Sequence, residues 1–538
     1  ASMTTTSGTD LDPRTPVIVG VGEASERLGE PGCAGLSPVA LAAAAAQAAL
    51  TDAAVAADTG DASQTSVVDR LARDVDVVAF VRPFEDSGLE ERSPLGRADN
   101  APRAVARRVG ADPVRAVLGV GGGQSPHDLV VEFAAEIAAG RAKSALVVGA
   151  EALSSSRHWS QRPAEDRPHW TETVGGDLED RGPGLADMTS PRQAALGLDH
   201  APPAYALFEN ARRARLGLPR EAYARTMGEL FAPFTEVAAT NPHAAAPTRR
   251  SAEELVTVTE RNRLVAEPYP RFVVARDQVN QGAAVLLTSL GRARDLGLDP
   301  SRFVFCHGHA SVKERPLMER ADLSTSPAVA LAVGAALDEA GLAADDLDVL
   351  DVYSCFPIAV TVVREALGFA PDDPRGFTVT GGLPFFGGPG NDYALHSLAQ
   401  AAARLRERPG TKGLVTANGG ILSSQSMGVW SSAPALWRPG RDDALAAEVA
   451  SWEAPRTTDD PRGAARVETF TVVHDRDGSR RGLVVGRLDD GDLRFLARAA
   501  DDPATWALLD ADQPVGAAMV VGADGLVRAA AAETDASS

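Results

Sequence analysis

Two clusters of glycines stand out because a helix start is expected directly after each of them. They occupy residues 121–123 and 387–390, and polar side chains follow both. The N–H groups in the first turn of a helix attract negative charge, so such a place can hold a phosphate or an oxyanion. We therefore predict that Gly123, Gly387 and Gly388 lie against a bound ligand.

The polar residues behind the first cluster permit either catalysis or simple helix capping. Ser125 is followed by a proline and then, three residues after the serine, by Asp128, a combination typical of a capped helix start. We favour the cap for Ser125. His127 could act as a base because imidazole titrates near neutral pH, but an ordinary place in the first helical turn is the stronger interpretation.

Behind the second cluster, an amide and an imidazole could stabilise developing negative charge. Asn391 and His396 follow the glycines, and Asn418 stands beside two further glycines from which it could aim an amide at the same point. Helix capping by Asn391 is the alternative, and we favour it slightly.

Two of the five tyrosines, Tyr353 and Tyr393, are candidate proton donors. A phenol can give a proton or a hydrogen bond to an enolate or an alkoxide. A space-filling role stays equally open for both.

The cysteines do not indicate a disulfide framework or a metal site. Cys33, Cys306 and Cys355 are an odd number, lie far apart and form no Cys-x-x-Cys spacing. The run 306–309 holds one cysteine and two histidines without a carboxylate partner. We therefore predict no metal site.

Charge and hydropathy exclude several classes of partner. The formal net charge is −20, and no basic block of five residues gives a footprint for nucleic acid or anionic lipid. The longest apolar stretch is too short to span a membrane. The first six residues lack the basic start and apolar stretch of a signal peptide, so we expect a cytoplasmic protein.

The order of expected strands and helices repeats along the chain. Apolar runs at 17–25 and 303–311 begin the two copies, and each copy continues with an alanine-rich helix, a buried strand, a glycine-opened helix and a further strand. Alternating strands and helices predict parallel sheets covered by helices. We therefore expect two similar α/β halves around a pseudo-twofold axis.

Two regions lie outside this repeat. The first is rich in arginine, proline and charge, with amphipathic helices near 205–216 and 220–230, and the second alternates with period two between turn sequences, typical of a small OB-like barrel. The predicted domains are residues 13–153 and 273–295 (first half), 154–272 (inserted loop domain), 300–437 (second half), 438–463 (linker) and 464–530 (barrel).

With these motifs the chain resembles the thiolase superfamily, particularly the actinobacterial thiolase-like proteins that carry an extra C-terminal domain. The resemblance covers essentially the whole chain. It implies a duplicated α/β thiolase fold of two βαβαβαββ halves in a five-layered core. The anchors are residues 17–22, 281–284, 353–356, 381–383, 387–389 and 417–420.

The sequence departs from the family at every catalytic position. The resemblance places the nucleophilic cysteine at Gly123, the acid/base cysteine at Ala417 and the histidine of the Gly-His-Pro motif at Gly388. Tyr353 and Ser354 replace the polar residue and carboxylate of a third motif. Thiolytic or Claisen activity is therefore predicted to be absent or weak, since a thiolate is the nucleophile in that chemistry.

What the resemblance still implies is binding of a coenzyme A thioester, as substrate or ligand, by a member of an acyltransferase family. Arg249 and Arg250 beside a capped helix start are suited to the phosphates, although a solvated charged face is equally open. Ser125 could replace the nucleophile. Alternatives are a cysteine-independent C–C lyase of the retro-aldolase type using Tyr353 and Tyr393, or a non-catalytic carrier or scaffold. Either a homodimer, paired through the thiolase core, or a monomer is compatible.

Overall fold

The computed structural model describes residues 11–58, 64–88, 92–184 and 188–530. The first six residues, on which the expected absence of a signal peptide rests, lie outside these ranges. Within them, no helix combines the length and the apolar character that a membrane crossing requires.

The sheet of the first half is assembled from both sides of the inserted segment. Valine-rich and alanine-rich strands form its buried centre, where β2 runs parallel to both β3 and β4 and where β8 runs antiparallel to β1 and β4. The strand order is β1 (Pro16–Ser25), β8 (Asn280–Ser289), β4 (Ser144–Ala152), β2 (Val77–Phe80), β3 (Arg115–Leu118) and β5 (Glu179–Asp180).

The sheet of the second half repeats this arrangement. Its order is β9 (Phe305–Lys313), β12 (Ser424–Ser431), β11 (Gly413–Gly419) and β10 (Val349–Asp351). The pairings β11–β12 and β12–β9 are antiparallel and β10–β11 is parallel, as in the corresponding pairs of the first half. The duplication predicted from the sequence is confirmed.

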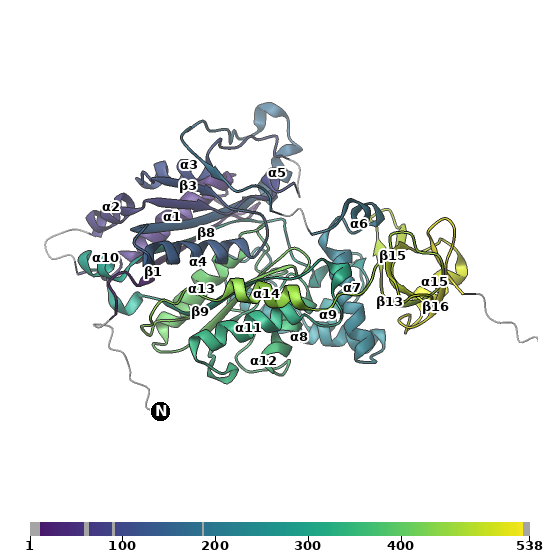
Figure 1. The fold of residues 1–538 in the computed structure, drawn as a ribbon. Helices are drawn as coiled ribbons and strands as arrows, with labels where there is room; N and C mark the ends of the chain where they lie inside the picture. The colour runs from purple at the N-terminus through teal and green to yellow at the C-terminus, as the bar shows by residue number, and fades with distance from the viewer. Residues whose placement is uncertain (1–10, 59–63, 89–91, 185–187, 531–538) are drawn as a thin grey trace, which may run out of the picture.

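Helices separate and cover the two sheets, which gives the predicted layers (Figure 1). Two alanine-rich and leucine-rich helices, α4 (Ser125–Ala138) and α13 (Tyr393–Glu407), share one apolar core with both sheets. The outer helices are α1 (Pro38–Ala53), α2 (Gln64–Asp74), α3 (Ala101–Val109) and α10 (Leu290–Asp295) on the first half and α11 (Pro327–Ala340) and α12 (Pro357–Leu367) on the second.

The inserted segment packs its aromatic side chains into the core of the second half. Tyr205 and Phe208 on one helix, and Phe231 and Phe234 on the next, belong to that core. The two helices predicted from amphipathic spacing are present, although the second continues through Pro233 to Thr240. The elements are α5 (Leu153–Ser160), α6 (Pro191–Leu196), α7 (Ala201–Arg215), α8 (Arg220–Thr240), α9 (Ala252–Val256), β6 (Leu264–Ala266) and β7 (Tyr269–Pro270).

The additional C-terminal domain is a curled sheet rather than a closed barrel. Its strands pair in the order β15-β14-β13-β16-β17, and a single bridge between Ala499 and Val527 joins the two ends. The elements are α14 (Asp442–Ser451), within the expected linker, then β13 (Gly463–His474), β14 (Arg480–Leu488), β15 (Arg494–Arg498), α15 (Pro503–Asp510), β16 (Ala518–Val521) and β17 (Val527–Ala529).

Strand pairing between β13 and the inserted segment bears on the predicted OB-like barrel, whose strands are present but do not close among the described residues. β16 pairs only with residues 463–466 of β13, and farther along that strand β6 takes the same role, with Val473 opposite Ala266. The edge that a barrel strand would cover is thus covered by a strand from another domain. Nothing in the local alternation of residues 464–530 could indicate this.

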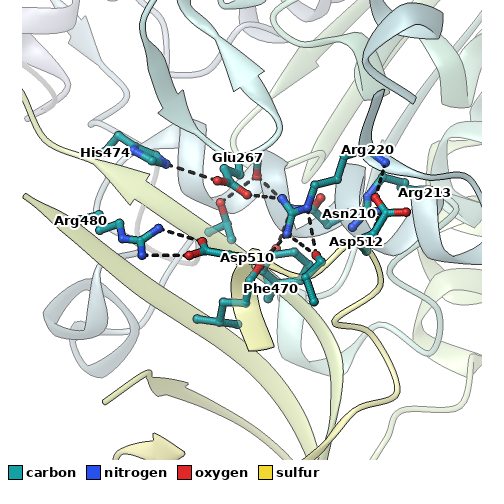
Figure 2. Close-up of polar contacts among 12 residues, drawn as sticks. Asn210, Arg213, Arg220, Glu267, Phe470, His474, Arg480, Asp510 and Asp512 are labelled. Carbon is teal, nitrogen blue, oxygen red and sulfur yellow. Dashed lines mark hydrogen bonds and ion pairs between the residues drawn. The ribbon is translucent and has the colours of Figure 1, made fainter. Parts of the chain in front are cut away.

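Polar contacts hold the additional domain against α7 and α8 (Figure 2). The amide of Asn210 donates to the backbone carbonyl oxygens of Glu267 and Phe470, at 2.9 and 2.8 Å. Arg213, which is fully buried, donates to the carbonyl oxygen of Asp512 at 2.6 Å. These buried contacts join the additional domain to the inserted segment.

Candidate functional site

Gly123 and Tyr353 occupy the centre of the site. A Cβ atom on Gly123 would lie 2.3 Å from the Tyr353 hydroxyl and 2.3 Å from the backbone oxygen of Asn418. The space that a nucleophilic side chain would need at residue 123 is therefore filled by the Tyr353 phenol and by β11. Burial raises the pKa of this phenol well above its usual value, so it is a hydrogen-bond donor and not a base.

The start of α4 differs by one residue from the prediction. Gln124 precedes the helix and Ser125 is its first residue. The Gln124 side chain makes no capping hydrogen bond. The expected cap by Ser125 is thus wrong, because the chain enters the helix one residue earlier. Ser125 is buried close to Gly119.

His127 points away from Gly123 toward β12. Its Nε2 accepts from the Trp430 indole at 3.3 Å, which leaves Nδ1 to donate to the Ser426 hydroxyl at 2.8 Å. Burial lowers the pKa of His127 to about 3. Both ring nitrogens are used in the structure, so the ordinary structural role of His127 is the one the geometry favours.

Asn418 is held by a tyrosine that sequence reasoning missed. Its Nδ2 donates to the Tyr205 hydroxyl at 2.8 Å, and its Oδ1 accepts from Gln425 at 2.8 Å. The same hydroxyl accepts from Leu422 N and donates to Gly420 O. Tyr205 thus fixes the β11–β12 turn beside the site from the inserted segment. The only sequence signal for Tyr205 is the rarity of tyrosine, which occurs five times in the chain.

Asn391 connects the two glycine clusters. Its Oδ1 accepts from Gly122 N at 2.9 Å, and its Nδ2 donates to the carbonyl oxygen of Arg82 at 2.7 Å. The buried amide therefore holds the loop before Gly123 against the first half. This replaces the expected helix cap, because Asp392 is the residue that precedes α13.

Tyr393 contacts Tyr353 only through its ring, at a centroid distance of 5.5 Å. Its hydroxyl lies 2.6 Å from the Thr380 hydroxyl and donates to the buried Asp351 carboxylate at 3.0 Å. Two phenols are therefore close together, but their hydroxyls face different surroundings. Tyr353 is the one directed at Gly123.

His396 belongs to a buried acidic cluster between the halves. Its Nδ1 lies 2.7 Å from Glu23, and its Nε2 lies 3.9 Å from Asp392. Burial, together with the nearby carboxylates of Glu151 and Glu23, raises the pKa of Asp392 well above its usual value. Asp392 therefore gives up its proton less readily in the folded protein than in the unfolded chain.

We expect Asp392→Asn to stabilise the protein more at pH 8 than at pH 5. An aspartate in the unfolded chain ionises near pH ~4, whereas folded Asp392 keeps its proton to higher pH. The wild type therefore loses stability as pH rises between these two pKa values, by at most about 1.4 kcal/mol per unit. Asparagine cannot ionise and removes that loss. Urea unfolding at both pH values measures it, with exposed Asp443→Asn as the control. An equal effect of Asp392→Asn at pH 5 and pH 8 would contradict the assignment.

Gly387 and Gly388 lie against the segment that leaves the inserted domain. Gly387 has φ +135° and approaches the Gln281 amide so closely that a Cβ would lie 2.5 Å from it, so glycine is required. Gly388 N donates to the carbonyl oxygen of Arg276 at 2.7 Å. The Gln281 side chain, which was also not predicted as a site residue, holds this turn by donating to the carbonyl oxygen of Phe386.

Of the two arginines predicted to bind phosphate, Arg250 lines a separate cavity of about 330 Å³ on the inserted segment, and Arg249 does not. Arg250 stacks over the Phe272 ring at 4.1 Å, and Arg249 pairs with Glu236 at 2.7 Å on the surface. The pKa of Arg276 is lowered by burial and then by the positive charges of Arg271 and Arg250. Arg250 and Arg261 line the cavity together with Glu253 and Glu254, and Arg276 lies close enough to Arg250 for their charges to interact. Guanidinium groups are suited to binding anions.

The start of α9 contributes less than expected. Ser251 accepts from Glu254 N, and the Glu254 carboxylate accepts from Ser251 N, so an acidic side chain already satisfies this terminus. Guanidinium groups, rather than the helix start, supply the positive charge of the cavity.

Comparisons with known proteins agree with this architecture. The family described as "Thiolase-like protein type 1 additional C-terminal domain" matches residues 444–526, and "Thiolase C-terminal domain-like" matches residues 309–432. A 3-ketoacyl-CoA thiolase from Erwinia tasmaniensis is 30% identical over 149 residues, which cover 25% of this chain and 32% of the relative. The chain thus matches about a third of that relative's length.

Solved structures extend the likeness to the whole chain. The Ltp2-ChsH2(DUF35) aldolase is similar in fold, with 19% identity, a TM-score of 0.53 and coverage of 78% of this chain and 98% of that chain. The monomeric SCP2-thiolase like protein type 1 from Mycobacterium smegmatis is 42% identical, with a TM-score of 0.80 and coverage of 97% and 100%. The chain therefore belongs to the thiolase superfamily, in the SCP2-thiolase-like type 1 group with an additional C-terminal domain.

Proposed function

We propose that the protein binds a coenzyme A thioester and does not carry out thiolysis. The observation that carries the proposal is the cavity at Arg250, Arg261 and Phe272, together with the segment 272–276, which leads along the chain from the cavity to the site. Along that segment Ala275 N donates to Cys355 O, Arg276 N to Leu383 O, and Gly388 N to Arg276 O. The segment that follows Phe272 thus runs from the cavity to Gly388, which supports a ligand that extends in the same direction.

The ring of Phe272 and the guanidinium of Arg250 suit the two chemical parts of the nucleotide end. An aromatic ring offers a surface on which a base can stack, and arginines bind phosphate through paired donors. Arg276 is partly buried, and its Nε has no hydrogen-bond partner among the described residues, so an anion nearby would relieve it.

The absence of thiolysis follows from the residues at the centre. Residue 123 has no side chain, residue 417 is an alanine and residue 388 is a glycine, so neither a thiolate nor the family's histidine is available. A lyase activity would have to rely on Tyr353, because the Tyr393 hydroxyl is bonded to Asp351.

We expect Arg250→Gln to weaken binding of coenzyme A about tenfold, while dephospho-coenzyme A loses less affinity, because a charged hydrogen bond to phosphate contributes about 1.5–3 kcal/mol. Isothermal titration calorimetry at fixed salt measures both ligands. Arg261→Gln, in the same cavity, tests the neighbouring guanidinium, and Arg225→Gln on the exposed face of α8 is the control. Undetectable binding of coenzyme A by the wild type would overturn the proposal.

We also propose that the protein is a monomer in the cytoplasm. The 42% identical relative is described as monomeric, which supports the same state here. Sedimentation velocity of the full chain tests it.

A further inference from the structure

A second and larger cavity, of about 700 Å³, reaches the site from the direction of the additional domain. Its inner end is formed by Gly121 and Gln124, next to Gly123, and by Gly420, which follows Asn418 and Gly419. It shares no lining residue with the cavity at Phe272. The larger cavity is thus separate from the one at Phe272, and its own lining reaches the residues beside Gly123.

Segments outside the duplicated core build most of the walls. The cavity is lined by Arg192, Gln193 and Leu196 from α6, by residues 457–459 from the linker, and by Leu496 from β15. Ala446, Val449 and Ala450 stand on one face of α14, at the i, i+3 and i+4 spacing. A chain made only of the two halves would lack this cavity, so the additional domain and its linker create it.

The lining mixes apolar side chains with polar ones, and the polar ones include the charged Lys313, Glu314, Arg315 and Glu319. Hydroxyl groups of Thr457 and Thr458 and the Arg192–Asp459 ion pair, 3.4 Å long and exposed, stand near the mouth. The apolar side chains are Met188, Leu196, Met318, Val449 and Leu496. A volume of this size accommodates a drug-sized organic molecule. The lining suits a bulky apolar group that carries a few oxygen atoms.

Gln124 marks the junction between the cavity and the centre. It is nine-tenths buried, and its Oε1 has no hydrogen-bond partner among the residues the structure describes. The same oxygen lies beside Gly419. A Cβ atom on Gly419 would be 1.7 Å from Gln124 Oε1 and 3.1 Å from the backbone nitrogen of Gly123. An unpaired buried acceptor is costly, so a donor group of a ligand at this junction would stabilise it.

We propose that this cavity holds the acyl group of the bound thioester, so that the additional domain selects which acyl groups are accepted. The inference rests on the proposed binding of coenzyme A. The nucleotide lies at Arg250, the thioester lies near Gly123, and the acyl group passes Gln124 into the space beside α14. The ligand class is a thioester of a bulky, mainly apolar acid.

Titration calorimetry of the full chain with free coenzyme A, decanoyl-coenzyme A and decanoyl-pantetheine tests this. We expect the wild type to bind decanoyl-coenzyme A at least tenfold more tightly than coenzyme A. Ala450→Trp should abolish that gain and leave coenzyme A binding within twofold. Val449→Phe, which extends a buried lining side chain, is the second filling variant. Ala447→Trp, on the same helix but outside the lining, is the matched control and should behave as the wild type.

The outcomes separate the two proposals. If the wild type gains nothing from the acyl chain, or both filling variants keep the gain, the acyl assignment is overturned. If coenzyme A does not bind while decanoyl-pantetheine binds and Ala450→Trp abolishes it, the cavity assignment stands and the nucleotide site fails.

Discussion

Replacing Arg494 with methionine should lower the free energy of unfolding by about 3–5 kcal/mol, the cost of removing one partner from a buried charge pair. Arg494 on β15 is fully buried. It pairs with Glu468 and donates to the carbonyl oxygens of Met318, Arg320 and Ala321, which belong to the second half. Methionine fills similar space but leaves these buried acceptors unsatisfied.

A neighbour of Arg494 supplies the matched control. Arg487 on β14 also binds Glu468, at 3.0 Å, but about a quarter of its side chain is exposed and it bonds no carbonyl of the second half. Arg487→Met should cost less than about 1 kcal/mol, as is usual for exposed pairs. Urea unfolding of both variants measures the difference. Equal losses would show that Glu468, and not the contact with the second half, determines the effect.

Because Arg494 joins the additional domain to the second half, its loss should also expose the domain to protease. Trypsin cleavage in the linker region near residues 456–462 is expected to become faster in Arg494→Met and to stay unchanged in Arg487→Met. The order of cleavage rates then distinguishes undocking of the domain from a general loss of stability.

The duplicated core could be predicted from the sequence because its information is local. Buried strands such as 75–80 and 347–352 show as apolar runs, and the glycines at 387–390 mark places where φ or close approach excludes side chains. Each of these patterns lies within a few residues of sequence. Because the two halves repeat the same elements, each pattern occurs twice and supports the same prediction. The order of strands then follows from the rules of α/β packing.

What could not be predicted depends on partners that are far apart in the chain. Tyr205 meets Asn418 across 213 residues, and Gly122 meets Asn391 across 269. β6 pairs with β13 only because α7 places the two domains together. The periodicity of apolar residues indicates which face of an element is buried, but not which other element covers that face. It therefore could not predict these contacts or the cavity beside α14.

Gly123 stands where the thiolase family has its nucleophilic cysteine, and we expect that a cysteine at this position would not give thiolytic activity. In Gly123→Cys the new Cβ would lie 2.3 Å from both the Tyr353 hydroxyl and the backbone oxygen of Asn418. Such overpacking costs about 1–3 kcal/mol. We expect Gly123→Cys to be less stable in urea than the wild type, while Gly388→Ala, whose nearest neighbour is a Leu383 methyl group at 3.3 Å, changes little.

Removing the Tyr353 ring as well would free the first of these contacts but not the second, because the Asn418 oxygen is part of the β11 backbone. The double variant Gly123→Cys with Tyr353→Ala should therefore still show no thiolysis of acetoacetyl-coenzyme A above the wild type, which we expect to be inactive. Turnover near that of a cysteine-bearing thiolase in any of the three proteins would contradict this. We therefore expect the backbone around residue 123, and not only the side chains at the two positions, to prevent thiolysis.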